Sequence, residues 1–111
     1  MCIRDRAEAI QRGYESAASV PLEVAKRAVS LMEAAREATE KGNVNAASDG
    51  ASAALMLFAA ASCAVANVEI NAAAMKDRSA AEGMLADVAT LRAEAAGLLD
   101  ATTRAFAERL A

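Results

Sequence analysis

Histidine is absent from this chain, and proline, cysteine and aromatic residues are scarce. Without histidine, any general acid or base must be Asp, Glu, Lys, Tyr or Cys. The two cysteines, Cys2 and Cys63, lie 61 positions apart, so they form neither a disulfide framework nor a metal-ligand motif. We therefore expect no metal site. The single proline and five glycines provide few turns, which argues against a β-rich fold.

Alanine dominates what remains, and hydrophobic residues make up 56% of the 111 positions. Alanine has the best helix propensity and lets helix axes approach closely, so the composition favours tightly packed helices. The sequence predicts an all-α, antiparallel helical bundle forming one domain or part of one. A net charge of −3 leaves no basic footprint, so we expect no nucleic-acid partner. The sparse cysteines fit a reduced, cytoplasmic protein.

A membrane span is the alternative for one long apolar stretch. No residue between Gly50 and Val68 is charged, and this length is close to that of a spanning helix. However, eight of these positions are alanine, and Ser52, Ser62 and Asn67 interrupt the run. Alanine adds little to bilayer insertion, so a helix apolar on all sides at the centre of a bundle is the better interpretation. The charged first twenty residues also lack a signal-peptide core.

Helical periodicity marks two further segments. Residues 7–18 are weakly helical, and the pattern breaks before Pro21, which suits the first position of a new helix. That helix is expected to end at a left-handed Gly42. Its apolar stripe comprises Leu22, Ala25, Val29, Met32, Ala35 and Thr39. A later helix is predicted to start at a capping box, Ser79 with Glu82. Its heptad seam comprises Met84, Val88, Leu91, Ala95, Leu98, Thr102 and Ala105.

Two polar segments flank the Ala-rich helix, predicted from Ala51 to at least Ala66. The first, residues 42–50, packs two asparagines, a serine, an aspartate and two glycines between apolar patterns. Ser48 or Asp49 is expected to cap the helix that follows. The second polar segment contains Asn67 and Asn71, which share a helix face at i,i+4 spacing. These two segments are the candidates for function.

The first six residues look foreign to the rest. They resemble translated adaptor sequence at the start of genes assembled from metagenomes, so we expect residues 1–6 to be a non-native leader. Residues 7–111 would then be the C-terminal part of a domain truncated at its N-terminus. The alternative is a genuine, frayed N-terminus.

Four motifs in order carry a family resemblance. They are the run Val20-Pro21-Leu22-Glu23-Val24-Ala25, the polar residues of 42–49, the run Asn67-Val68-Glu69-Ile70-Asn71, and Lys76-Asp77. From about Ala7 to Arg109, the chain resembles the C-terminal half of the formiminotransferase-cyclodeaminase family. Family members usually begin with a Pro-Gly-Gly-Gly-Ser type segment, which is absent here. They also usually read Ser-Asp-Ala-Gly where this chain has Ser48-Asp49-Gly50-Ala51, which leaves the geometry of that turn open.

The resemblance implies a dimeric, cytosolic, all-helical enzyme of folate one-carbon metabolism. A cyclodeaminase (an ammonia-lyase) closes the formimino group of formimino-tetrahydrofolate into the methenyl form and releases ammonia. A cyclohydrolase opens methenyl-tetrahydrofolate to the formyl form with water. The implied partners are a tetrahydrofolate derivative and a second copy of the chain, with no cofactor beyond the folate substrate. We expect the truncated fragment alone to be inactive.

Both reactions need a proton donor for the leaving amine and a group that stabilises a cation. Asp49 is the candidate catalytic residue, although helix capping is an alternative role. The remaining candidates would bind substrate: the asparagines at the pterin edge, and Lys76 with Asp77 at the carboxylate tail. Ser48 joins them, because without a histidine partner it is no nucleophile. The candidate substrate-binding residues are Asn43, Asn45, Ser48, Asn67, Asn71, Lys76 and Asp77.

Structural roles compete with these assignments. Turn formation would account for the first asparagine pair, hydrogen bonding between helices for the second, and a solvated helix end for Lys76 and Asp77. The competing function is a non-catalytic module that self-associates through its Ala-rich face and heptad seam. A homologue retained only for assembly is a third possibility.

Overall fold

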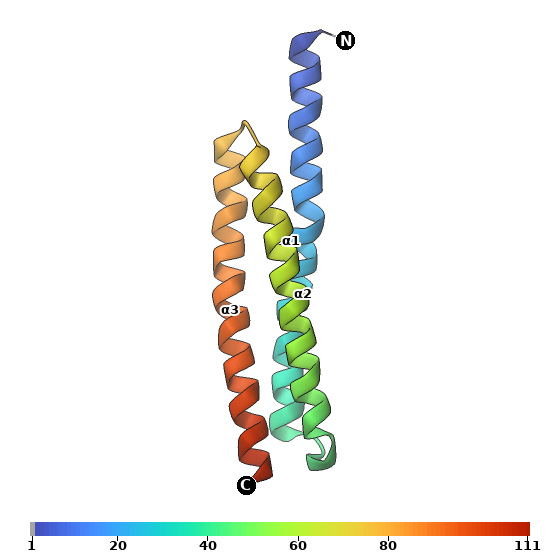
Figure 1. Ribbon diagram of the computed structural model, residues 1–111, viewed down its shortest axis with the longest axis vertical. Coiled ribbons are helices and arrows are strands. Elements are labelled where there is room, and N and C mark those ends of the chain that lie inside the picture. The colour runs from blue at the N-terminus through green and yellow to red at the C-terminus, as the bar shows by residue number, and fades with distance from the viewer. Residues whose placement is uncertain (1) are drawn as a thin grey trace.

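Three long helices, joined by two short connections, make up residues 2–111, the part of the chain described in this computed structural model. They are α1 (Ile3–Lys41), α2 (Ala47–Ala74) and α3 (Arg78–Leu110), and a short 3₁₀ helix, η1 (Val44–Ala46), precedes α2. Neighbouring helices run antiparallel in a rod of 66 × 19 × 15 Å, and the start of α1 projects past the α2–α3 turn (Figure 1). The predicted all-α antiparallel bundle is therefore confirmed.

Helix α1 is continuous through Pro21, so the predicted break before this proline is wrong. Proline lacks the N–H that would bond to the carbonyl four residues earlier, which belongs to Ala17. In the structure, that carbonyl accepts a hydrogen bond from Asn71 Nδ2 of α2 at 3.4 Å. Because the neighbouring helix supplies the missing donor, the helix continues where the sequence pattern suggested a boundary.

The apolar stripes of α1 and α3 form the core as predicted. All six stripe positions of α1, from Leu22 to Thr39, are buried. In α3, the heptad seam is buried or half-buried throughout, and Val88 and Thr102 are almost completely enclosed. Helix α2 meets α1 through small residues, with Ala54, Ala61 and Val68 fully buried at seven-residue spacing. This spacing keeps one narrow side of α2 against its partner along the whole contact.

Helix α2 is nevertheless not the fully enclosed central helix that the sequence suggested. Only 28% of its most apolar 18-residue window is buried, and Leu55, Met56 and Ile70 are each more than half exposed. The prediction failed because three helices can cover only part of the circumference of any one of them. By length and composition alone, Val44–Ala74 is the one helical stretch among residues 2–111 that would suffice to cross a membrane.

The connection between α1 and α2 differs from the predicted geometry. Gly42 is extended, with φ −77° and ψ −172°, and is not left-handed. Its N–H bonds to the Ala38 carbonyl at 2.9 Å, and a Cβ at position 42 would lie 2.5 Å from that same oxygen. Glycine is thus needed for space rather than for a left-handed conformation.

Both predicted helix caps are also wrong. Helix α2 begins at Ala47 without a side-chain cap, so Ser48 and Asp49 lie inside its first turn. The cap is instead upstream, where Asn43 Oδ1 accepts from the Asn45 N–H at 2.9 Å and starts η1. Helix α3 is capped by Asp77, whose Oδ1 accepts from the Ala80 N–H at 3.1 Å. The capping-box serine, Ser79, follows this cap.

Close packing of α1 on α2 generates a prediction at Gly50. A Cβ at this position would lie 2.2 Å from Thr39 Oγ1, and Thr39 is fully buried with its hydroxyl bonded to the Ala35 carbonyl. We expect Gly50→Ala to destabilise the bundle by about 1–3 kcal/mol through overpacking, measured by urea unfolding followed by circular dichroism.

Gly83→Ala is the matched control, because a Cβ there would meet nothing within 4 Å. It should stabilise the protein by about 0.5–1 kcal/mol through helix propensity alone. Equal stabilisation by both substitutions would contradict the proposed clash with Thr39.

Candidate functional site

The eight residues predicted from the sequence lie in two separate groups. Asn43, Asn45, Ser48 and Asp49 lie between α1 and α2 and in the first turn of α2; we call them the knot cluster. Asn67, Asn71, Lys76 and Asp77 lie at the far end of α2 and in the turn to α3; we call them the turn cluster. Asp49 and Asn67 are separated by 18 residues, or about 27 Å along the helix.

The two clusters nevertheless share one face of α2. Eighteen residues make about five full helical turns, so Asp49 and Asn67 project from the helix in the same direction. Met56, Ala60 and Cys63 lie between them on this face, and all three are exposed. One chain therefore presents two polar ends separated by an uncharged exposed stripe.

An arginine that the sequence patterns did not single out closes the C-terminus of α1, just before the knot cluster. From the end of α3, Arg109 donates hydrogen bonds to the carbonyls of Thr39, Glu40 and Gly42, the last from Nη2 at 2.7 Å. These carbonyls are at the C-terminus of α1, where helical partners are missing and positive charge is favourable. The contacts span up to 70 residues of sequence, so local spacing contained no signal for them.

The asparagines of the turn cluster border a groove between α1 and α2. Asn67 Nδ2 donates to the Cys63 carbonyl at 3.1 Å, and Asn71 Nδ2 donates to the Asn67 carbonyl at 2.9 Å as well as to Ala17. Asn71 thus makes the hydrogen bond between helices that the structural alternative proposed, whereas Asn67 bonds within α2. Among residues 2–111, no hydrogen bond to the side-chain oxygen of either asparagine is formed. The groove encloses about 410 Å³ and is lined by Ala17, Val20, Pro21, Val24, Ala60, Cys63, Ala64, Asn67 and Asn71.

Lys76 and Asp77 form an exposed turn that is held from two sides. Gln11 of α1 accepts hydrogen bonds through Oε1 from the Lys76 N–H at 2.9 Å and the Asp77 N–H at 3.3 Å. Arg78 donates from Nη1 to the Ala72 and Met75 carbonyls and so closes the C-terminus of α2. Sequence reasoning missed both residues, since a glutamine and an arginine on helix surfaces are individually unremarkable.

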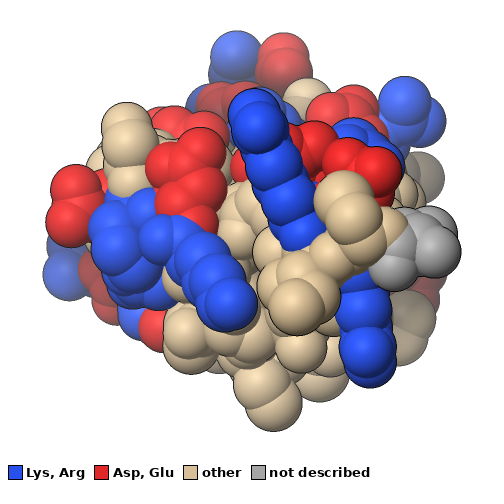
Figure 2. All heavy atoms as spheres, turned by 90° about the horizontal axis from the view of Figure 1, so that it is seen from above, with Lys and Arg blue, Asp and Glu red and all other residues tan. Residues whose placement is uncertain are grey.

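Charge at this end of the rod is distributed unevenly. Figure 2 looks down on the end that carries the start of α1 and the α2–α3 turn, and basic and acidic side chains cover its upper part while the lower edge is uncharged. The uncharged helical face follows from the absence of any charge between Gly50 and Val68. A ligand in the α1–α2 groove would therefore meet apolar walls first and charged groups toward the turn.

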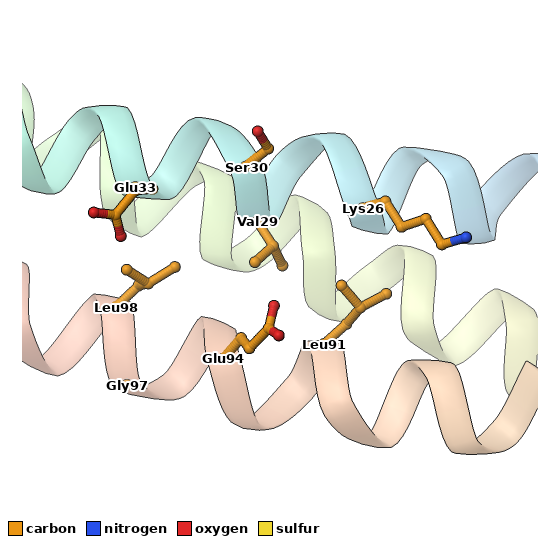
Figure 3. Close-up of a pocket in the computed structure, with 8 residues that line it drawn as sticks. All are labelled: Lys26, Val29, Ser30, Glu33, Leu91, Glu94, Gly97 and Leu98. Atoms are coloured by element: carbon orange, nitrogen blue, oxygen red, sulfur yellow. The ribbon is translucent and has the colours of Figure 1, made fainter.

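A second groove, of about 480 Å³, lies between α1 and α3 and contains none of the predicted residues (Figure 3). Its acidic side chains are Glu33 and Glu94. The hydrogen bond from Arg36 lowers the pKa of Glu33 below its usual value, and the hydrogen bonds that Arg36 donates to Glu33 and Glu40 raise the pKa of Arg36. Both shifts keep Glu33 and Arg36 charged, so the pKa of Glu33 moves away from the neutral range in which a general base works best.

Within residues 2–111, no three side chains of His, Cys, Asp or Glu gather closely enough to hold a metal ion. The two clusters together provide two carboxylates, four amides, one hydroxyl and one ammonium group.

Comparison with known proteins identifies the family. The family model for formiminotransferase-cyclodeaminase matches residues 3–108. The chain belongs to the formiminotransferase-cyclodeaminase family. A curated relative from Methylorubrum extorquens (strain AM1), named methenyltetrahydrofolate cyclohydrolase, is 37% identical over 93 residues. That alignment covers 84% of this chain but only 45% of the relative, so the chain spans about half the length of this family member.

The structure also explains the local departure from the family pattern in the knot. The family usually has Ser-Asp-Ala-Gly, and here the glycine is one position earlier, at Gly50. A Cβ at Gly50 would lie 2.2 Å from Oγ1 of the buried Thr39. In this member of the formiminotransferase-cyclodeaminase family, the shifted glycine therefore fits the contact with α1.

Helix capping in the turn cluster can be tested apart from function. We expect Asp77→Ala to cost about 1 kcal/mol of unfolding free energy, because it removes the acceptor for the Ala80 N–H at the start of α3. Ser79→Ala, the matched control two residues later, should change stability by less than about 0.5 kcal/mol. Thermal and urea unfolding without ligand measure both values. A larger loss in Ser79→Ala would instead restore the capping box as the start of α3.

Proposed function

We propose that this chain is part of a cytoplasmic enzyme that acts on one-carbon derivatives of tetrahydrofolate, with hydrolysis of methenyl-tetrahydrofolate to the formyl form as its reaction. Membership of the formiminotransferase-cyclodeaminase family carries this proposal, and the name of the M. extorquens relative favours hydrolysis. Cyclodeamination of formimino-tetrahydrofolate, the reaction in the family name, is the second candidate. The methenyl form is the product of cyclodeamination and the substrate of hydrolysis, so one site suits either reaction.

The groove between α1 and α2 is the proposed place for the substrate. Its apolar walls suit the flat pterin and aminobenzoyl rings, and the side-chain oxygens of Asn67 and Asn71 can accept from the pterin N–H groups. Lys76 lies five residues beyond Asn71, past the end of α2, and lines two neighbouring grooves along α1. We assign its exposed ammonium to the carboxylate tail of a folate that extends from the groove toward the turn.

Hydrolysis also needs a proton-transfer group. Water adds to the methenyl carbon, and the resulting tetrahedral carbon loses one C–N bond as the leaving nitrogen gains a proton. Asp49 is the candidate for this proton transfer and for stabilising the cationic carbon. It lies about 27 Å from Asn67 in its own chain, further than one substrate can bring together. We therefore assign it to a site completed by a second copy.

A two-fold dimer through the exposed face of α2 would complete the site. Because Asp49 and Asn67 share this face, an axis midway between them, between Met56 and Ala60, would place Asp49 of one copy level with Asn67 of its partner. The face between them is uncharged, and on α1 the adjacent Val20 and Val24 are 65% and 47% exposed. Such a surface is suited to self-association, which makes a homodimer the proposed assembly.

The catalytic proposal is tested with the full-length protein that contains this chain. Loss of the methenyl chromophore is followed in wild type and Asp49→Ala, and we expect Asp49→Ala to slow turnover by about 10²–10⁴-fold. Asp87→Ala, which removes an exposed carboxylate on α3, is the matched control and should keep wild-type activity.

Ammonia release from formimino-tetrahydrofolate without methenyl hydrolysis would instead assign the chain to cyclodeamination. Inactivity of the folded protein toward both folates would favour the non-catalytic self-association module.

Complementation tests the shared site. Asp49→Ala and Asn67→Ala are each expected to be inactive, but a heterodimer of the two has one site with both native residues. When equal amounts of the two variants exchange subunits, about half of the dimers are heterodimers, and each heterodimer has one intact site out of two. About one quarter of the wild-type activity should therefore return. The measurement is methenyl hydrolysis before and after subunit exchange. No recovery, despite exchange verified with a tagged copy, would rule out a site shared between copies.

A further inference from the structure

Gln11 makes the longest-range polar contact at the turn cluster, and neither the family motifs nor the catalytic proposal includes it. It lies on α1, where that helix passes the α2–α3 turn, and it is only partly buried. Its Oε1 accepts from two successive backbone N–H groups, those of Lys76 and Asp77, across 65 and 66 residues of sequence. Its Nε2 donates to Glu15 Oε1 at 3.0 Å.

These three bonds determine the orientation of the amide. Backbone N–H groups need an acceptor and a carboxylate needs a donor, so the oxygen must face the turn and the nitrogen must face Glu15. Glu15 thus keeps the glutamine side chain pointed at the turn. The N–H groups of Lys76 and Asp77 have no partner within a helix, because both residues precede the first turn of α3.

The location of this contact links it to ligand binding. The peptide groups that Gln11 holds belong to Lys76 and Asp77, and the Lys76 side chain lines the adjacent grooves along α1. The Lys76 side chain is otherwise free to move, since it is exposed and makes no ion pair among the described residues. By holding the backbone of Lys76, Gln11 can therefore direct the Lys76 ammonium toward an anion.

We propose that Gln11 is a positioning residue, whose carboxamide anchors the Lys76–Asp77 turn to α1 so that Lys76 binds the carboxylate end of the substrate. This inference rests on the proposed folate function for the identity of the ligand, while the anchoring itself is independent of it. Gln11 acts through the turn and does not touch the reacting atoms, so it should affect substrate affinity more than the chemical step.

Gln11→Met is the variant that removes the contact. Methionine has a similar length and no carbonyl, so it abolishes both hydrogen bonds to the turn with little change in volume. Amide hydrogen exchange at Lys76 and Asp77 should accelerate by about tenfold in the full-length protein. In methenyl-tetrahydrofolate hydrolysis, KM should rise roughly five- to tenfold while kcat stays within about twofold.

The double variant Gln11→Glu/Glu15→Gln is the rescue. It keeps the net charge, leaves a carboxylate oxygen to accept from the turn, and reverses the donor in the pair between positions 11 and 15. It should restore slow amide exchange and the wild-type KM. Thr103→Val is the control, because it removes one side-chain hydrogen bond within α3 and should alter neither quantity at the turn.

Each outcome decides one part of the proposal. Unchanged amide exchange in Gln11→Met would overturn the anchoring. Faster exchange with an unchanged KM, or a loss confined to kcat, would overturn the role in substrate binding. Wild-type protein that binds and converts neither folate would reject the proposed function and the ligand assignment together, while amide exchange would still decide whether Gln11 anchors the turn.

Discussion

The close approach of α1 and α2 is the contact on which the rest of the structure depends. Buried alanines at seven-residue spacing in α2, with Gly50 against the buried Thr39, let the two helices pack closely. Dispersion attraction between small residues is strong only at such short separations. The same approach brings Asn71 within reach of the carbonyl freed by Pro21, so α1 continues as one helix. Helix α3 then packs against the joined pair through its heptad seam.

Polar side chains fix the two ends of this rod. Arg109 closes the C-terminus of α1, Arg78 closes that of α2, and Gln11 holds the turn that starts α3. Each of these side chains bonds to backbone groups that have no partner within a helix. Each therefore adds a hydrogen bond and removes the energetic cost of an unpaired N–H or carbonyl group. The polar segments that the sequence marks as functional are thus rigidly held, which favours a binding site over a flexible linker.

The uncharged face of α2 connects the fold with the proposed function. Polar groups lie at both of its ends, and an apolar exposed stripe joins them. Within one chain the ends are too far apart to act together, yet their identical orientation suits a symmetric pairing of two copies. The proposed dimer therefore explains two features together. It would cover the exposed apolar face of α2, and it would bring the two separated clusters of different copies together.

The sequence by itself determined the helical class, the buried stripes of α1 and α3, the family and the two polar segments, because periodicity and motif order are local properties of the chain. Gly42 marks the end of α1 as predicted, whereas the predicted caps at Ser48 and Ser79 lie one or two residues inside their helices. Only tertiary contacts decided that α1 passes through Pro21 and that Arg109 and Gln11 hold the helix ends. These outcomes depend on donors and acceptors more than fifty residues apart meeting in space, and no local pattern encodes such a pairing. The caps at Asn43 and Asp77 are local contacts, but several neighbouring polar residues could have served, and the sequence did not choose between them.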